Sequence, residues 1–315
     1  MKQFILGLVI VGAFIGHGKA QEIGKKTVQS EWNVVDHVPV EKFLIQSHRG
    51  AGVLAEENTI DAFKLGWSMG TVPESDLRTT KDGIIVAFHD DNFKRVVKGA
   101  SEELKKKGVA DLTFAELTKL DVGSWKGEQF QGRHVSKITE AFDLMKGHPE
   151  RQLYLDIKNI SLPQLAKEVQ SRRIDKQVIL ASTKYDIIHE WKALVPQSQT
   201  LLWLGGDEAK LKERFVEVRK SNFSDITQLQ VHVRLNKDKK SPEPFTPSSE
   251  FIMNVGKEVR SHNIVFQSLP WEIADPKVYS AMLDLGVASF ATDHPDVTVK
   301  AVKDYYEKKK KVVLP

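Results

Sequence analysis

Two acidic residues, Glu74 and Asp76, lie two positions apart in the run 71–77, which the sequence predicts as a β-strand. Because side chains alternate between the two faces of a strand, both carboxylates point to the same face. Two like charges this close repel each other unless a cation lies between them, and hard oxygen ligands favour Ca²⁺ or Mg²⁺. The pair therefore predicts a metal site, although two solvent-facing acids on a strand edge would give the same pattern.

Asp156 and Lys158 repeat this spacing at the end of the apolar run 153–157. They also fall on one face of a strand. One interpretation is an ordinary salt bridge beyond the strand end. The functional interpretation makes Asp156 the third carboxylate of the metal site and Lys158 a contact for a substrate phosphate.

Two histidines, His48 and His89, each directly follow an apolar run and precede a polar residue. The ordinary pKa of an imidazole lies near neutral pH, so two histidines flanking a bound phosphate can serve as general acid and base. Arg49, next to His48, has the planar guanidinium that holds a phosphate with two hydrogen bonds. Gly50 allows the backbone to turn sharply away from the site. Together these residues predict a metal-dependent site that hydrolyses phosphate diesters.

The elements that must position these residues alternate along the chain from residue 43 onward. Predicted strands span 43–47, 71–77, 84–88, 153–157, 177–182, 200–204, 227–233, 263–268 and 287–291. Predicted helices span 58–68, 113–120, 138–147, 160–172, 185–194, 207–221, 247–261, 275–285 and 296–309. Such alternation predicts a mostly parallel sheet covered by helices. The length of the alternating region fits an α/β fold of the (β/α)8 TIM-barrel type, which typically needs about 250 residues.

We expect this barrel to be somewhat distorted. Nine candidate strands are one too many, and the Asp82-Gly83 turn leaves no room for a helix between 71–77 and 84–88. The pattern does not identify the strand that lies outside the barrel. The lysine-rich segment 91–137 is predicted to be an insertion after the third strand, within one barrel domain spanning 43–315.

The first twenty residues resemble a secretory signal peptide. Lys2 precedes a nearly unbroken apolar run at 4–15, and small residues follow at Gly18-Lys19-Ala20. The run is too short to span a bilayer as a free helix, and an uncleaved N-terminal anchor is the alternative. We expect cleavage after residues 1–20, a surface lead-in at 21–42, and an exported protein, periplasmic or secreted, without stable membrane insertion.

Composition limits the partners and the chemistry. The formal net charge of +4 is small for 315 residues and does not predict nucleic-acid binding. The chain has no cysteine, which excludes disulfides and thiolate metal ligands. Several further histidines, among them His134, His189 and His232, are interpreted as structural. A small-molecule phosphodiester is the expected partner, and the oligomeric state stays open.

The order of the polar residues resembles the glycerophosphodiester phosphodiesterase family over roughly residues 43–297. The motifs that carry the resemblance are His48-Arg49-Gly50, Glu57-Asn58-Thr59 with Ala62-Phe63, Glu74-x-Asp76, Thr80-x-Asp82-Gly83, His89-Asp90, Leu112-Thr113 with Glu116-Leu117, Asp121-Val122-Gly123-Ser124-Trp125, Asp156-x-Lys158 and Thr292-Asp293-x-Pro295. Each motif alone is common, but this many in one order are specific together.

The resemblance implies a barrel fold and one divalent cation, Ca²⁺ or Mg²⁺. It implies hydrolysis of glycerophosphodiesters to glycerol 3-phosphate and an alcohol. By position it makes His48 and His89 the catalytic acid/base pair. The metal ligands it implies are Glu74, Asp76 and Asp156, and the phosphate-binding residues are Arg49 and Lys158.

The chain departs from the family pattern at two informative places. Asp156 stands where the family usually has Glu, so the third ligand is one methylene shorter. The late segment 266–272 reads Phe-Gln-Ser-Leu-Pro-Trp-Glu where the family usually has Trp-Thr-Val-Asn, which leaves the alcohol part of the substrate open. Lysophospholipids or phosphoinositol-type diesters remain alternative substrates. A catalytically silent binding protein and a zinc hydrolase that uses both histidines are further alternatives.

Overall fold

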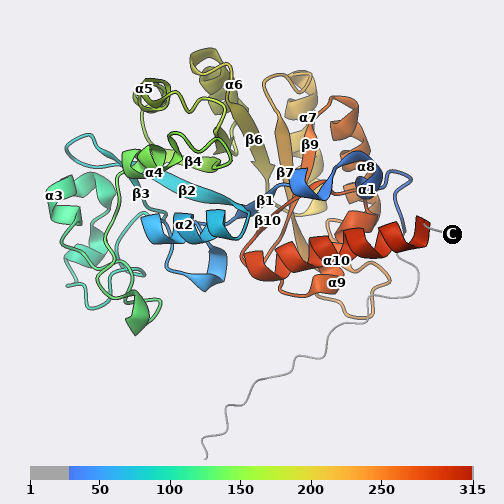
Figure 1. Ribbon diagram of the computed structural model, residues 1–315, viewed down its shortest axis with the longest axis horizontal. Coiled ribbons are helices and arrows are strands. Elements are labelled where there is room, and N and C mark those ends of the chain that lie inside the picture. Colours follow the sequence, from blue (N-terminus) through green and yellow to red (C-terminus); the bar gives the residue numbers. More distant parts are fainter. Residues whose placement is uncertain (1–27, 314–315) are drawn as a thin grey trace, which may run out of the picture.

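The computed structural model describes residues 28–313 (Figure 1). The predicted signal peptide, residues 1–20, and the first part of the predicted lead-in lie outside these residues.

Eight parallel strands close into a barrel, which confirms the predicted fold class. They are β1 (Ile45–Ser47), β2 (Val72–Thr79), β4 (Leu153–Asn159), β5 (Val178–Ser182), β6 (Gln199–Leu204), β7 (Gln228–Leu235), β9 (Val265–Pro270) and β10 (Ser289–Thr292). Strand β1 closes the barrel because it pairs in parallel with both β10 and β2. The carboxyl ends of all eight strands therefore meet at one face, where TIM-barrel enzymes carry their active sites.

Of the nine predicted strands, the third, 84–88, is the one that lies outside the barrel. It forms β3 (Ile85–Ala87), which runs antiparallel to β2 after the Asp82-Gly83 turn. Gly83 has a φ of 80°, and Thr80 donates a hydrogen bond from Oγ1 to Asp82. A further short strand, β8 (Phe245–Thr246), pairs antiparallel with β7 and was not predicted.

All nine predicted helices occur, and most of them cover the outside of the barrel (Figure 1). They are α2 (Ile60–Ser68), α3 (Phe114–Leu117), α4 (Ile138–Met145), α5 (Leu162–Arg172), α6 (Tyr185–Leu194), α7 (Glu208–Lys220), α8 (Ser249–Ser261), α9 (Pro276–Asp284) and α10 (Pro295–Val313). Short 3₁₀ helices span Val40–Lys42, Gly52–Leu54, Leu104–Lys106, Val109–Asp111 and Glu128–Phe130. Helix α2 begins after Thr59, whose side chain accepts a hydrogen bond from the Ala62 amide.

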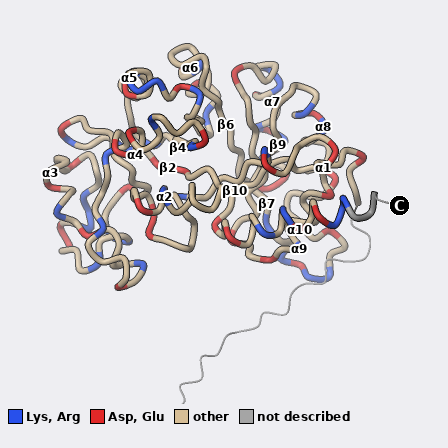
Figure 2. Tube along the Cα trace, in the orientation of Figure 1, with Lys and Arg blue, Asp and Glu red and all other residues tan. Residues whose placement is uncertain are grey.

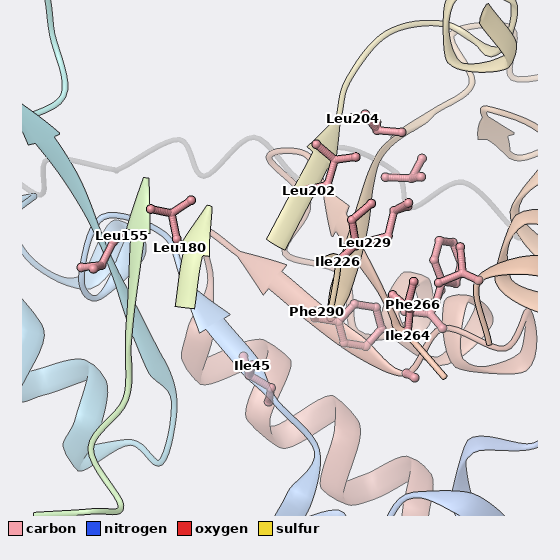
Figure 3. Packing of buried hydrophobic residues seen from close by; sticks show 14 of the residues in the cluster. Ile45, Leu155, Leu180, Leu202, Leu204, Ile226, Leu229, Ile264, Phe266 and Phe290 are labelled. Carbon is pink, nitrogen blue, oxygen red and sulfur yellow. The ribbon is translucent and has the colours of Figure 1, made fainter. Parts of the chain in front are cut away.

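The alternation of side chains along each strand builds two separate layers. Outward-facing residues such as Leu180, Leu202 and Phe290 pack together in the large core under the helices (Figure 3). Inward-facing residues of β2, β4 and β5, namely Val72, Tyr154 and Ile179, form a smaller apolar layer inside the barrel. This regular burial of every second side chain on each face fixes the strand register, and with it the direction of the polar side chains.

Two segments outside the barrel are also partly buried: the insertion has an apolar cluster of its own, and the lead-in inserts a side chain into the main core. The insertion, 91–137, encloses a separate apolar cluster that includes Phe88, Phe93 and Leu117. In the lead-in, α1 (Val34–His37) buries Val34 completely in the main core. Along the chain, Lys and Arg are interspersed with Asp and Glu (Figure 2). Within residues 28–313, the helices are too short or too polar to cross a membrane.

Candidate active site

Three carboxylates meet inside the barrel at the carboxyl ends of two neighbouring strands. Glu74 and Asp76 lie on β2, and Asp76 is in register with Asp156 on β4. One oxygen of each residue lies within 4.8 Å of one oxygen of the other two. All three residues are buried, with 5%, 1% and 5% of their surface exposed, respectively. The prediction that strand periodicity turns these acids to one face is confirmed.

Burial makes these carboxylates difficult to ionise together. Burial raises the pKa of Asp156, and the nearby charge of Glu74 adds to this, so the pKa is about 7. Burial also raises the pKa of Glu74. It acts in the same direction on Asp76, but the positive charges of Lys158 and Arg49 outweigh it and lower that pKa. The site without a cation therefore retains a proton near neutral pH, shared between Glu74 and Asp156.

Asp76 is held in place by Asn58. The Asn58 side chain donates to Asp76 Oδ2 at 2.8 Å and accepts from the Asp76 amide at 2.9 Å. The other oxygen, Oδ1, is buried and receives no hydrogen bond from any residue that the structure describes. Lys158 Nζ lies 3.1 Å from it. An oriented, buried carboxylate oxygen without a hydrogen bond is what a metal ligand requires, so the three acids fit a hard divalent cation.

Lys158 and Arg49 bring positive charge to the acids from two sides. Lys158 Nζ lies 2.7 Å from Asp156 Oδ2. Arg49 Nε lies 3.8 Å from Asp76 Oδ2, and its Nη1 donates to Glu57 at 3.1 Å. Arg49 has a φ of 52° and Gly50 a φ of 109°, so the chain turns sharply directly after β1. An added Cβ at Gly50 would lie 2.7 Å from the Ala62 Cβ, which explains the glycine.

His48 lies at the end of β1 and contacts two acids. Its Nδ1 is 2.6 Å from Asp293 Oδ1, and its Nε2 is 3.8 Å from Glu74 Oε2. Burial acts to lower the pKa of His48, but the charges of Glu74 and Asp293 outweigh it and raise the pKa to about 9. Asp293 follows β10, so its contact with His48 depends on the pairing of β10 with β1 that closes the barrel.

His89 follows β3 and carries its own acid. Its Nδ1 lies 2.7 Å from Asp90 Oδ1, and its backbone carbonyl accepts two hydrogen bonds from Arg78. His89 and His48 line the same cavity of about 100 Å³, together with the other five predicted site residues. The structure thus brings together all seven residues singled out from the sequence, while their chemical roles remain predictions.

Two wider cavities adjoin this central one. The cavity beside His48 and Arg49 measures about 310 Å³ and is lined by Trp125 and Trp271, among others. The cavity beside His89 measures about 610 Å³ and has mainly polar neighbours such as Asn92. The central cavity therefore shares lining residues with a wider cavity on each side: His48, Arg49 and Trp271 with the first, and His89, Asp156, Lys158 and Trp203 with the second.

Sequence reasoning missed several residues of this site. Asn58 and Asp293 were singled out only as members of family motifs, without a role in the site. The interpretation of His232 as structural is incomplete, because it lines the central cavity. Its ring stacks on Trp203 at 5.1 Å, and burial lowers its pKa to about 4, which keeps it neutral. The aromatic residue Trp203, inside an apolar strand, gave no signal separate from core packing.

The fold and the site define a TIM-barrel hydrolase with a buried acidic centre between two histidines. The profile of the Glycerophosphoryl diester phosphodiesterase family matches residues 48–297, and the chain belongs to this family. It is accordingly an enzyme, a phosphoric diester hydrolase. The family resemblance predicted from the sequence is confirmed.

Individual relatives agree with this assignment along most of the chain. A glycerophosphodiester phosphodiesterase of Caldanaerobacter subterraneus subsp. tengcongensis is 26% identical, over 83% of this chain and 98% of the relative. A lysophospholipase D of Homo sapiens is 25% identical, over 79% of this chain and 82% of the relative. A solved phosphodiesterase of Oleispira antarctica, in complex with the product sn-glycerol-3-phosphate, has a TM-score of 0.59 at 21% identity. The alignment covers 86% of this chain and 100% of that structure's chain.

Proposed function

We propose that the protein is an exported phosphodiesterase that requires a divalent metal and hydrolyses glycerophosphodiesters to glycerol 3-phosphate and an alcohol. The observation that carries the proposal is one cavity lined by three buried carboxylates, two cationic side chains and two histidines, each held by an aspartate. The product named in the Oleispira antarctica structure supports the glycerol 3-phosphate half of the substrate.

Glu74, Asp76 and Asp156 would hold the cation, and three carboxylates with no softer ligand among them favour Ca²⁺ or Mg²⁺. A cation bound there would supply positive charge to a phosphoryl oxygen. Arg49 and Lys158 lie on the rim of the same cavity. Their side chains bind the phosphate and neutralise the charge that develops on it as the ester bond breaks.

His48 and His89 carry the proton transfers in this proposal. Each imidazole has Nδ1 against an aspartate, so its Nε2 is left to face the substrate. One imidazole accepts a proton from the attacking water as the new P–O bond forms, and the other gives a proton to the leaving alcohol oxygen as the ester P–O bond breaks. Asp293 and Asp90 hold the rings in orientation and stabilise the protonated forms.

Export follows from the predicted leader. Its positive start, apolar run and small residues before position 21 support cleavage by a signal peptidase. N-terminal sequencing of the protein recovered from the periplasm or the medium would check this. An N-terminus at Met1 on a cell-bound protein would contradict it.

The test of the activity is product analysis on glycerophosphocholine. We expect equimolar glycerol 3-phosphate and choline, loss of turnover with a chelator, and recovery when Ca²⁺ or Mg²⁺ is added in excess. Phosphocholine and glycerol as products would refute the proposed bond cleavage. Binding of the diester without turnover at any divalent ion would indicate a binding protein instead.

Lysophospholipids are a second candidate substrate class. The cavity beside His48 is lined by Trp125, Trp271 and Val53, and the Val53 residue is 43% exposed. This apolar surface fits an alkyl or acyl chain, and one relative bears the name lysophospholipase D. A comparison of kcat/KM for glycerophosphocholine and lysophosphatidylcholine distinguishes the two. Equal or lower values for the lysolipid would count against an acyl-chain site.

A further inference from the structure

We propose that Arg95, near the start of the insertion, is a positioning residue that holds His89 and Arg49 in one arrangement through two carboxylates. The inference rests on the proposed function, because it takes His89 as an acid/base and Arg49 as a phosphate ligand. It adds a residue outside the seven predicted from the sequence, and it gives the insertion a part in catalysis.

On one side, Arg95 holds the carboxylate that orients His89. Arg95 Nε lies 2.8 Å from Asp90 Oδ2, and Arg95 Nη2 lies 2.8 Å from Asp90 Oδ1. Asp90 Oδ1 is also the atom that pairs with His89 Nδ1, at 2.7 Å. The two-point contact fixes the plane of the Asp90 carboxylate, and this plane sets the tilt of the imidazole.

On the other side, Arg95 holds the carboxylate that orients Arg49. Arg95 Nη1 lies 2.9 Å from Glu57 Oε2, and Nη2 lies 2.6 Å from Glu57 Oε1. Glu57 Oε2 also accepts the hydrogen bond from Arg49 Nη1, at 3.1 Å. The guanidinium of Arg95 therefore joins two chains of contacts, one ending on His89 and the other on Arg49, and both of these residues line the central cavity.

The surroundings of Arg95 strengthen both contacts. Its guanidinium carbon lies 4.9 Å from the centre of the Trp125 ring, which is also part of the insertion. The side chains of Glu57 and Asp90 are only 13% and 19% exposed, so water screens the ion pairs weakly.

Removing the guanidinium would leave two negative charges facing each other. Glu57 and Asp90, with His89, offer oxygen and nitrogen atoms that all lie within 4.8 Å of one another. Arg95 contacts both acids, so it acts as the counter-charge of this cluster. Without it, the acids repel each other and both catalytic partners lose their fixed orientation.

The position predicts a particular kinetic pattern. Loss of carboxylates that orient metal-bound histidines costs about 10–100-fold in activity or affinity, and we expect an effect of that size here. Asp90→Asn should lower kcat through His89, whereas Glu57→Gln should mainly raise KM through Arg49. Arg95→Ala should do both.

Arg133 provides a matched control in the same insertion. It is 41% exposed, against 39% for Arg95, and it also pairs with two acids, Glu56 at 3.1 Å and Asp61 at 2.6 Å. Neither acid contacts a predicted site residue in the hydrogen bonds and ion pairs of the described chain. Arg133→Ala should therefore change thermal stability as much as Arg95→Ala does, and leave kcat and KM near the wild-type values.

The experiment measures kcat, KM and the thermal midpoint with glycerophosphocholine and saturating Ca²⁺ or Mg²⁺. The proteins are wild type, R95A, R95K, D90N, E57Q, R133A and the double variant R95A/D90N. We expect the double variant to lose no more in kcat than D90N alone, because both changes act through His89. R95K should stay folded and recover only part of kcat, since an ammonium cannot contact both carboxylates in a fork. Millimolar guanidinium should partly restore R95A and leave R133A unchanged.

Three outcomes would overturn the inference while the wild type remains active. They are kinetics of R95A like those of R133A, full activity in R95K, or additive losses in R95A/D90N. An inactive wild-type enzyme would instead refute the proposed function itself.

Discussion

The pH dependence of metal binding is the sharpest consequence of the buried carboxylates. Asp156 has a pKa of about 7 in the metal-free site, raised by burial and by Glu74. A cation binds the ionised carboxylate, so binding must release the proton that Asp156 carries below that pKa. Metal affinity should therefore be highest above neutral pH and fall as the pH decreases through 7.

The size of the effect follows from this pKa. With one titrating proton, the ionised fraction of Asp156 drops about 25-fold between about pH 7.5 and about pH 5.5. The apparent Kd for the metal should rise by the same factor, which corresponds to about 2 kcal/mol. The pKa of Glu74 is also raised by burial, so protons released from Glu74 would make the dependence steeper.

Isothermal titration calorimetry with Ca²⁺ and Mg²⁺ measures both quantities. Titrations in two buffers of different ionisation enthalpy give the number of protons released on metal binding. Near pH 6 we expect at least about one proton per bound ion, because Asp156 is mostly protonated there. Asp156→Asn is the control: its amide does not titrate, so the slope of log Kd against pH should fall in magnitude by about one. An unchanged Kd across this range, with no proton release, would refute the assignment of Asp156 as a buried metal ligand.

Three other predictions concern catalysis and stability. His48→Ala and His89→Ala should each lower kcat by roughly 10²–10⁴-fold if each imidazole acts as acid or base, and near-normal turnover in either variant would contradict its role. Asn58→Ala should weaken metal binding by about 10–100-fold, because it releases both ends of the hydrogen-bonded pair with Asp76, and a Kd within error of wild type would argue against this. Saturation with metal at about 100 times its Kd should stabilise the fold by about 2.7 kcal/mol, seen as a rise in thermal midpoint that a chelator reverses. A midpoint insensitive to both would show that the cation does not bind the folded barrel.

Sequence periodicity predicted the barrel strands and nine helices, but it missed the shortest elements and did not show how each element is used. The run 84–88 has the apolar character of a barrel strand, yet it folds back as β3 because only residues 80–84 separate β3 from β2, too few for a crossover helix. Strand β8 is only two residues long, too short to produce a periodic signal. In the lead-in, α1 is a single turn of four residues in which Val34 is fully buried, and one turn is too short to show a helical period.

The predicted site residues share a local signature, whereas the missed residues do not. Glu74 and Asp76 lie two apart in a predicted strand, and Asp156 lies near the end of the apolar run 153–157, so their spacing singled them out as candidates. Asn58 and Arg95 lie in loops, where polar residues are ordinary and only the folded chain shows which acids they contact.

Barrel closure explains why the acid partner of His48 could not be found by spacing. His48 and Asp293 are 245 residues apart, yet β1 pairs directly with β10 and places Thr292 beside Ser47. The His48 amide donates to the Thr292 carbonyl at 3.0 Å, so the backbone that completes the barrel also sets the distance between the imidazole and its acid. A change that loosens this last strand pair should therefore impair His48 before it unfolds the rest of the barrel.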